Sequence, residues 1–418
     1  MMNVLIIKNL FANVYGVVVN LVFQILLVPL YINYWGKSLY SDWIVITSLT
    51  AFFSITNIGL STVTQNVYSI EYLNNNIKKC NSLIVNNVLL VSLVFIFSLI
   101  ISVIVLSIID LPILLHLSEM NRSLANFIFV SFLIYVYISM YGAILDSLFR
   151  AKSKYHIATF ISITSRLIEV LIIIFCVSCN VSIYFMVSLY LLPGLFLLLY
   201  KYKLAKSFIQ FSINKKYYDW SLFKQLIIPS VSFMSIPVSY SVLIQGSNLI
   251  VNYFFGPNAV ILYTTTRTLS NFITTFLKTI KHAIWPEFTI AFGRGDSKKM
   301  NKLYKTSVIL SLFFAILASI VLFFCGDWIY SIWLNGSVLF DASLMFSFVL
   351  IIIVHSLWES GSVVLESTNH HIVLGMLFIS LSIVTQLFAY IILTKYKFID
   401  VLPYSQLLME IIISFYVV

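Results

Sequence analysis

The sequence is poor in charged residues. Asp, Glu, Lys and Arg make up 10% of the chain, whereas hydrophobic residues make up 61% and the mean hydropathy is +1.01. Soluble globular proteins contain about 25% charged residues, with which they cover their surface. The shortage therefore excludes a water-soluble fold for these 418 residues and predicts side chains that face lipid or other helices.

Cysteine and the common catalytic motifs are also scarce. Of four cysteines, Cys176 and Cys179 form a single C-x-x-C without the second ligand pair of a zinc site, so we interpret them as packing residues. The sequence has no P-loop, no H-E-x-x-H, and no two aspartates within two residues of each other. We therefore predict no enzyme, no catalytic residue, no metal and no cofactor.

Long apolar runs recur along the whole chain. About 20 apolar residues are enough to cross roughly 30 Å of hydrocarbon as a helix. The first run is too long for a cleaved signal and is interpreted as an anchor helix. We predict twelve spans, at 9–34, 43–66, 83–109, 123–148, 157–178, 182–200, 223–250, 259–285, 306–325, 342–365, 371–393 and 401–418.

The lysines and arginines between the spans fall mostly on one side. If the N-terminus is inside, the outer loops hold only Lys37, Arg122, Lys395 and Lys397, and the other loop cations lie inside. The positive-inside rule then places both termini in the cytoplasm. We interpret the net charge of +10 mainly as an orientation signal, without a nucleic-acid partner.

An internal repeat appears at an offset of 220 residues. The offset superposes Gly36 on Gly256, each after two aromatic residues, and it superposes Lys78-Lys79 on Lys298-Lys299 in matching K-K-x-N-x-L segments. Six spans per half give both halves the same orientation, related by an axis along the membrane normal. The predicted domains are an N-terminal lobe (1–200), a basic cytoplasmic linker (201–222) and a C-terminal lobe (223–418).

The linker admits two interpretations. Leu204, Phe208, Ile209 and Phe211 beside lysines could form a short helix in the membrane interface. A solvated linker fits the same residues equally well.

Polar residues at helical spacing mark one face of several predicted spans. Hydrogen bonds between helices explain most small polar residues there. They explain Arg267 poorly, because it lies about 12 Å inside its helix and should face the bundle interior or a watery cavity. Lys278 and Lys281 could instead reach the cytoplasmic surface. The candidate substrate-binding residues are Arg267, Asn271, Thr274, Lys278, Lys281, Asn57, Asn20 and Gln24.

Two further pairs of ionisable residues lie inside predicted spans and are candidates for ion coupling. Arg166 and Glu169 are one turn apart, so a structural ion pair is as good an interpretation as a site. His355 and Glu359 share one helix face and could titrate or bind a coupling cation. A buried pair, or a partner for the cations of 259–285, is the alternative for both residues.

Together these features resemble repeat-unit (O-antigen or capsule) flippases. These form the polysaccharide-transporter branch of the multidrug/oligosaccharidyl-lipid/polysaccharide exporter superfamily. The resemblance covers essentially the whole chain. The sequence features that carry the resemblance are Pro29-x-Tyr31, the Tyr34-Trp35-Gly36 turn, the Lys78-Lys79 loop, the repeat and the cationic span 259–285.

The resemblance implies an all-α membrane protein with about twelve transmembrane helices, in two parallel six-helix repeats that form a V-shaped transporter. The implied substrate is an oligosaccharide on undecaprenyl diphosphate, moved by alternating access from the cytoplasmic to the outer leaflet of the inner membrane. Membrane lipid, and in some cases a polysaccharide polymerase, would be the partners.

Two alternative functions remain, a multidrug/cation antiporter of the same superfamily and a membrane polysaccharide polymerase. A membrane polysaccharide polymerase usually has a large outer loop, and the longest outer loop expected in this chain is about Gly326–Asp341.

Overall fold

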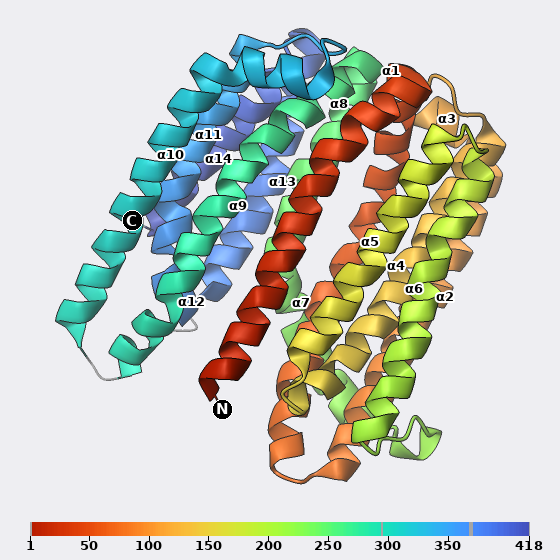
Figure 1. The fold of residues 1–418 in the computed structure, drawn as a ribbon, viewed down its shortest axis with the longest axis vertical. Coiled ribbons are helices and arrows are strands. Elements are labelled where there is room, and N and C mark those ends of the chain that lie inside the picture. Colours follow the sequence, from red (N-terminus) through yellow and green to blue (C-terminus); the bar gives the residue numbers. More distant parts are fainter. Residues whose placement is uncertain (1, 294–295, 368–370, 418) are drawn as a thin grey trace. The chain divides into compact units, whose positions relative to one another are not determined.

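The computed structural model describes the backbone of residues 2–293, 296–367 and 371–417. Side chains are described over the same ranges except at 2–10, 13–14, 54–63, 66, 70, 226–233, 236, 279–280, 282–287, 289–293, 366–367 and 371–372. Over these ranges the protein consists of helices and their connections, without strands (Figure 1). The candidate Asn57 has its side chain outside the described residues.

The chain forms two compact units, residues 1–237 and 238–418, and helix α7 runs from the first into the second. The first unit contains α1 (Met2–Leu73), α2 (Ile77–Ile108), α3 (Leu111–Leu114), α4 (Arg122–Ala151), α5 (Tyr155–Ser178), α6 (Ile183–Phe208), η1 (Lys215–Tyr217) and the start of α7 (Trp220–Ser241). The second contains the end of α7, η2 (Val242–Gly246), α8 (Ser247–Phe255), α9 (Pro257–Gly293), α10 (Ser297–Leu334), α11 (Ala342–Gly361), α12 (Val363–Ser367), α13 (His371–Lys395) and α14 (Val401–Val417).

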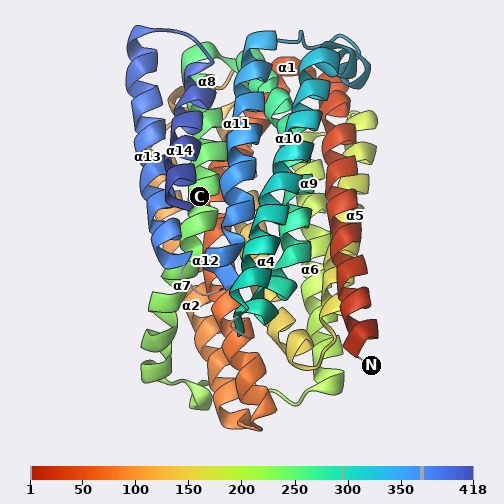
Figure 2. The ribbon, with the colours of Figure 1, turned by 90° about the vertical axis from the view of Figure 1, so that its left-hand side faces the viewer.

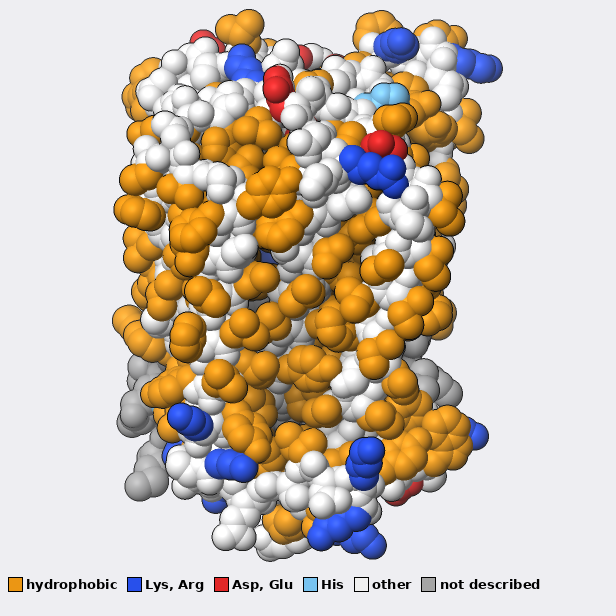
Figure 3. Space-filling view, turned by 90° about the vertical axis from the view of Figure 1, so that its right-hand side faces the viewer, with side chains coloured by type: hydrophobic (Ala, Val, Ile, Leu, Met, Phe, Trp, Pro, Cys, Tyr) orange, Lys and Arg blue, Asp and Glu red, His pale blue; other side chains and the backbone are white. Residues whose placement is uncertain are grey.

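Over the described residues, which end at 417, each of the twelve predicted spans coincides with helix, interrupted in 342–365 at Ser362, and several helices extend well beyond the apolar part. α10, for example, runs over 297–334 where a span at 306–325 was predicted, because a lysine-rich segment before the span and an aromatic segment after it continue the helix. The helix therefore includes part of the expected outer loop, which is shortened from Gly326–Asp341 to residues 335–341. On the face shown in Figure 3, hydrophobic side chains form a broad middle band and charged ones lie toward the ends.

The repeat is visible in the backbone at two pairs of equivalent positions. Gly36 (φ 76°, ψ 172°) and Gly256 (φ 76°, ψ −173°) adopt one conformation that is essentially restricted to glycine. Asn76 and Asp296, also 220 residues apart, cap the next helix by accepting a hydrogen bond from the backbone N–H of the residue three positions on. The offset of 220 is therefore a structural repeat as well as a sequence repeat.

Each unit is built around the helix that contains the fourth predicted span of its half. In the first unit α4 packs against α1, α2, α3, α5 and α6, and 56% of its most apolar window is buried. In the second unit α11 packs against α9, α10, α12 and α14, and 61% of the corresponding window is buried (Figure 2). The ion pairs Lys201–Asp146, Lys281–Glu359 and His355–Glu410 each include a residue of one of these two helices.

The segment expected to link the two lobes begins as a continuation of α6 and does not contain a separate short helix over Leu204–Phe211. Residues up to Phe208 continue α6, and Ile209 is buried in the core of the first unit. Beyond it, two asparagines of α2 hold the chain. Asn81 Oδ1 accepts from the backbone N–H of Ser212 at 3.1 Å, and the Asn86 amide donates to the Asp219 carbonyl at 3.0 Å. The connection is therefore fixed to α2 by side-chain hydrogen bonds.

A buried carboxylate organises the end of the first unit at which α4 begins. Asp42 is 0% exposed and accepts hydrogen bonds from three successive backbone N–H groups, of Ser118, Glu119 and Met120, at 2.7 to 3.1 Å. Hydrogen bonds to charged groups contribute about 1.5–3 kcal/mol each. Asp42 therefore fixes the turn that leads into α4.

We expect Asp42→Ala to lower the free energy of unfolding by about 2–4 kcal/mol, because the three N–H groups lose their acceptor and only part of the turn can be rehydrated. Thermal unfolding of the purified protein in detergent would measure the loss. Glu119→Gln, at an exposed neighbour in the same turn, is the matched control and should change little. An unchanged melting temperature for Asp42→Ala would contradict this assignment.

Candidate functional site

The interior of the second unit contains a row of charged side chains from α9, α11 and α14. On α9 the cations are Arg267, Lys278 and Lys281, whose separations of eleven and three residues place them along one side of the helix. Helix α11 packs against both α9 and α14 and carries His355 and Glu359. Three helices thus bring positive and negative groups together inside one unit.

Arg267 is held by oxygen acceptors near a π-helical turn. The turn, η2, interrupts the regular helix between α7 and α8, and π turns of this kind disturb the normal pairing of backbone carbonyls. Arg267 Nη1 donates to the carbonyl of Ile244, within η2, and Nη2 donates to Asn248 Oδ1, both at 2.9 Å. The guanidinium also lies 5.3 Å from the ring centroid of Tyr263. Among the described residues no carboxylate pairs with Arg267, so its charge is held in place and not cancelled.

Lys281 forms a buried ion pair with Glu359. Its Nζ lies 3.1 Å from Glu359 Oε1 and donates to Ser362 Oγ at 2.9 Å. Both side chains are buried, so Lys281 does not extend to the cytoplasmic surface. For Glu359 the structure thus shows the alternative in which it is a partner of the α9 cations.

His355 has a different partner, Glu410 on α14. His355 Nδ1 lies 3.0 Å from Glu410 Oε2, and Trp358 Nε1 donates to the same oxygen. All three residues are buried. The sequence analysis overlooked Glu410, although a single carboxylate in the apolar run 401–418 is unusual enough to mark it. Its pairing could not be predicted, because His355 is 55 residues away.

Lys278, like Arg267, is more accessible than the buried Lys281. It is half-buried, and its Nζ lies 4.6 Å from the ring centroid of Tyr240 on α7, which is a cation–π contact. Among the described residues it forms no ion pair. Asn271, one turn before Thr274 on the same helix, is exposed, and Thr274 Oγ1 donates to its backbone carbonyl at 3.1 Å. An accessible cation and an accessible amide therefore lie on α9.

In the first unit, Arg166 and Glu169 form the structural pair that their spacing allows. Arg166 Nη1 lies 3.3 Å from Glu169 Oε2, which also accepts from the Tyr135 hydroxyl at 2.9 Å. The same Nη1 donates to the Tyr190 hydroxyl at 2.6 Å. Glu169 is 2% exposed and Arg166 is 45% exposed, so the guanidinium is the accessible member of the pair.

A second pair in this unit was not predicted. Lys201 Nζ lies 2.6 Å from Asp146 Oδ1 and donates to Ser162 Oγ at 2.8 Å. Lys201 was expected in the cytoplasmic linker, but α6 continues to Phe208 and buries it. Both pairs line one cavity of about 280 Å³ between α4, α5 and α6.

The remaining candidates of the first unit lie on α1. Asn20 and Gln24 are both exposed and are one turn apart. In the part of α1 that follows the Gly36 turn, several polar side chains form hydrogen bonds within the helix or to a neighbouring helix, as expected for most small polar residues there. Thr47 donates back to the carbonyl of Trp43 at 2.7 Å, and Thr64 accepts from the Asn87 amide at 2.8 Å.

No protein-family model matches the sequence, and no curated protein matches it. Solved structures do match. An inward-facing multidrug resistance MATE family transporter of the MOP superfamily superposes with a TM-score of 0.79 at 11% identity, over 96% of this chain and 92% of that one. An outward-facing structure with the same description gives a TM-score of 0.67 at 12% identity, over 99% and 93%.

A third matching structure is a MOP superfamily transporter from Pyrococcus furiosus, described by a reversed polarity of its binding pocket that suggests a different function. Its TM-score is 0.68 at 12% identity, over 99% of this chain and 93% of that one. Likeness over nearly the whole length shows that the chain has the all-helical, two-lobed fold of these transporters. At these identities it shows the fold alone.

Proposed function

We propose that this protein is a membrane transporter that moves an anionic, sugar-bearing lipid, an oligosaccharide on undecaprenyl diphosphate, from the cytoplasmic to the outer leaflet by alternating access. The observation that carries this assignment is the cationic face of α9. Arg267 and Lys278 form no ion pair among the described residues, whereas Lys281 on the same helix is neutralised by Glu359. Two positive charges in an apolar interior suit a diphosphate, to which cations donate charge-assisted hydrogen bonds.

The polar neutral residues are proposed to contact the sugars. Asn271 on α9 and Asn20 and Gln24 on α1 are exposed, and amides can both donate to and accept from hydroxyl groups. Asn57 and Thr274 remain candidates for the same role. We also propose a location in the inner membrane, with both termini in the cytoplasm because the loop cations gather on that side.

Ion coupling is proposed to involve the buried carboxylates. Glu359 joins Lys281, and His355 joins Glu410, so a proton or cation bound at either carboxylate would change the charge balance beside Lys278. Arg166 and Glu169 are the corresponding candidates of the first unit.

A second candidate function is multidrug/cation antiport, and the comparisons favour it. The matching structures include transporters described as multidrug resistance proteins. The structure also reduces the positive charge available on α9, because Glu359 neutralises Lys281. A polysaccharide polymerase is less well supported, because the outer loop expected to be the longest is only residues 335–341.

Deletion of the gene distinguishes these functions. Loss of a flippase should abolish surface polysaccharide and leave lipid-linked units in the cytoplasmic leaflet. Loss of a drug antiporter should leave the polysaccharide intact and sensitise cells to cationic dyes. Loss of a polymerase should leave unpolymerised units in the outer leaflet. Accessibility of the lipid-linked units to an impermeant reagent, measured beside dye tolerance, separates the three results, and normal polysaccharide with dye sensitivity would overturn our assignment.

A further inference from the structure

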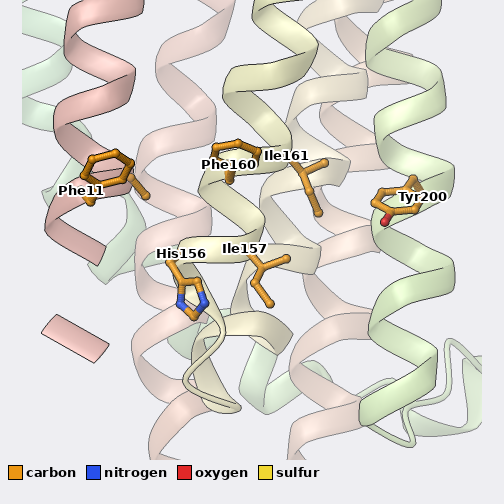
Figure 4. A pocket seen from close by; sticks show the side chains of 7 residues that line it. Phe11, His156, Ile157, Phe160, Ile161 and Tyr200 are labelled. Atoms are coloured by element: carbon orange, nitrogen blue, oxygen red, sulfur yellow. The ribbon is translucent and has the colours of Figure 1, made fainter. Parts of the chain in front are cut away.

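The first unit has a hollow on its apolar surface, lined by other residues than the cavity between α4, α5 and α6. It has a volume of about 650 Å³ and lies between the beginning of α1, the beginning of α5 and the second half of α6. Figure 4 shows His156, Ile157 and Phe160 of α5 between Phe11 of α1 and Tyr200 of α6. We call it the inner-leaflet groove, defined by these five residues and Ala12.

The groove is open and almost entirely hydrocarbon. Phe11, Phe160 and Tyr200 are 71%, 52% and 56% exposed and form its rim, whereas Ala12 is buried. α5 and α6 are apolar enough to cross a membrane, and α1 carries such a span from Tyr15 onward. The medium around the groove is therefore lipid, and the occupant that fits its walls is a hydrocarbon chain.

Cations lie at the end of the groove that the loop charges assign to the cytoplasm. Lys154 immediately precedes α5, two residues before His156, and its Nζ lies 4.3 Å from the ring centroid of Phe208 at the end of α6. Lys203 is exposed and follows Tyr200 by three residues, so it lies on the same side of α6 one turn further. Apolar walls that end in two lysines match a lipid chain that ends in a phosphate.

We propose that the inner-leaflet groove binds an anionic phospholipid of the cytoplasmic leaflet, with an acyl chain along Ala12 and Phe160 and the phosphate between Lys154 and Lys203. None of these residues belongs to the charged interior of the second unit. The lipid site can therefore exist whichever substrate the protein transports.

The test uses the full-length protein in nanodiscs of equal parts phosphatidylglycerol and phosphatidylcholine. After mild detergent extraction, native mass spectrometry counts the lipids that remain bound. We expect wild type to retain phosphatidylglycerol in preference to phosphatidylcholine. In the double variant Lys154→Gln/Lys203→Gln this preference should fall about thirtyfold, because each lysine contributes about 1 kcal/mol to binding of the anionic lipid. Ala12→Leu, which partly fills the groove, should reduce retention of both lipids.

The double variant Lys215→Gln/Lys216→Gln removes two exposed lysines from η1 and is the matched control, which should bind lipid like wild type. Equal loss in the control would show a general charge effect and overturn the assignment. Retention without a headgroup preference would also overturn it. So would displacement of phosphatidylglycerol by polyprenyl phosphate, because the groove would then belong to the transported lipid.

Discussion

Lys281→Met is expected to destabilise the second unit by about 3–5 kcal/mol. The substitution removes the ammonium but leaves Glu359 buried with a charge that has lost its partner, and breaking a buried ion pair on one side has costs of this size. Thermal unfolding in detergent, with size-exclusion chromatography to detect aggregation, would measure it.

The double variant Lys281→Met/Glu359→Gln separates stability from transport. Because both charges leave together, we expect it to regain most of the lost stability. If the pair only holds α9 to α11, transport returns as well. If Glu359 or Lys281 takes part in coupling, stability returns and transport does not, which is the result we expect. A double variant as unstable as Lys281→Met would contradict the ion pair itself.

Arg267→Lys is expected to lose at least nine tenths of transport although it keeps the positive charge. The guanidinium reaches the Ile244 carbonyl and Asn248 Oδ1 at once through two nitrogens, and a single ammonium cannot reproduce that fork. Arg267→Ala should abolish transport, because the cation is lost too. Surface polysaccharide, corrected for the amount of protein in the membrane, is the measurement.

Asn248→Ala is the control for Arg267. It removes the acceptor of Nη2 and leaves the cation in place, so we expect a loss of stability of about 1–3 kcal/mol and transport that remains well above that of Arg267→Lys. If Asn248→Ala and Arg267→Ala lose transport equally, the bonds around η2 matter and the charge does not. That result would contradict a substrate-binding role for Arg267.

The positions of the helices could be predicted from the sequence, because each helix depends on the local composition of the chain. An apolar run of about 20 residues forms a membrane helix whatever its neighbours are. The matching turns at Gly36 and Gly256 could be predicted as well, since each needs a glycine for its backbone conformation. The predicted ends of the helices were less accurate than their positions, because helices such as α6 and α10 continue past the apolar part of the sequence.

A single pairing could be predicted only where the partners are near in sequence, whereas for Glu359 the sequence left the α9 cations as one of several alternatives. Arg166 and Glu169 are three residues apart on one helix, and their spacing alone indicates the pair. The pairs Lys281–Glu359, His355–Glu410 and Asp146–Lys201 join different helices and depend on which faces pack together. A single sequence shows that such groups need partners, but it does not show which partners they find. The π-helical turn that offers the Ile244 carbonyl to Arg267 has no sequence signal that we recognise.

The most direct test of our central claim is translocation of a lipid-linked oligosaccharide by the purified protein. Vesicles would contain a fluorescent oligosaccharide on polyprenyl diphosphate, and an impermeant quencher would report the fraction in the outer leaflet. We predict that wild type equilibrates the two leaflets, that Lys278→Gln is at least tenfold slower, and that Lys302→Gln, at an exposed lysine of α10, behaves like wild type. An unchanged rate in Lys278→Gln, or export of cationic dyes without any movement of the lipid, would contradict the claim.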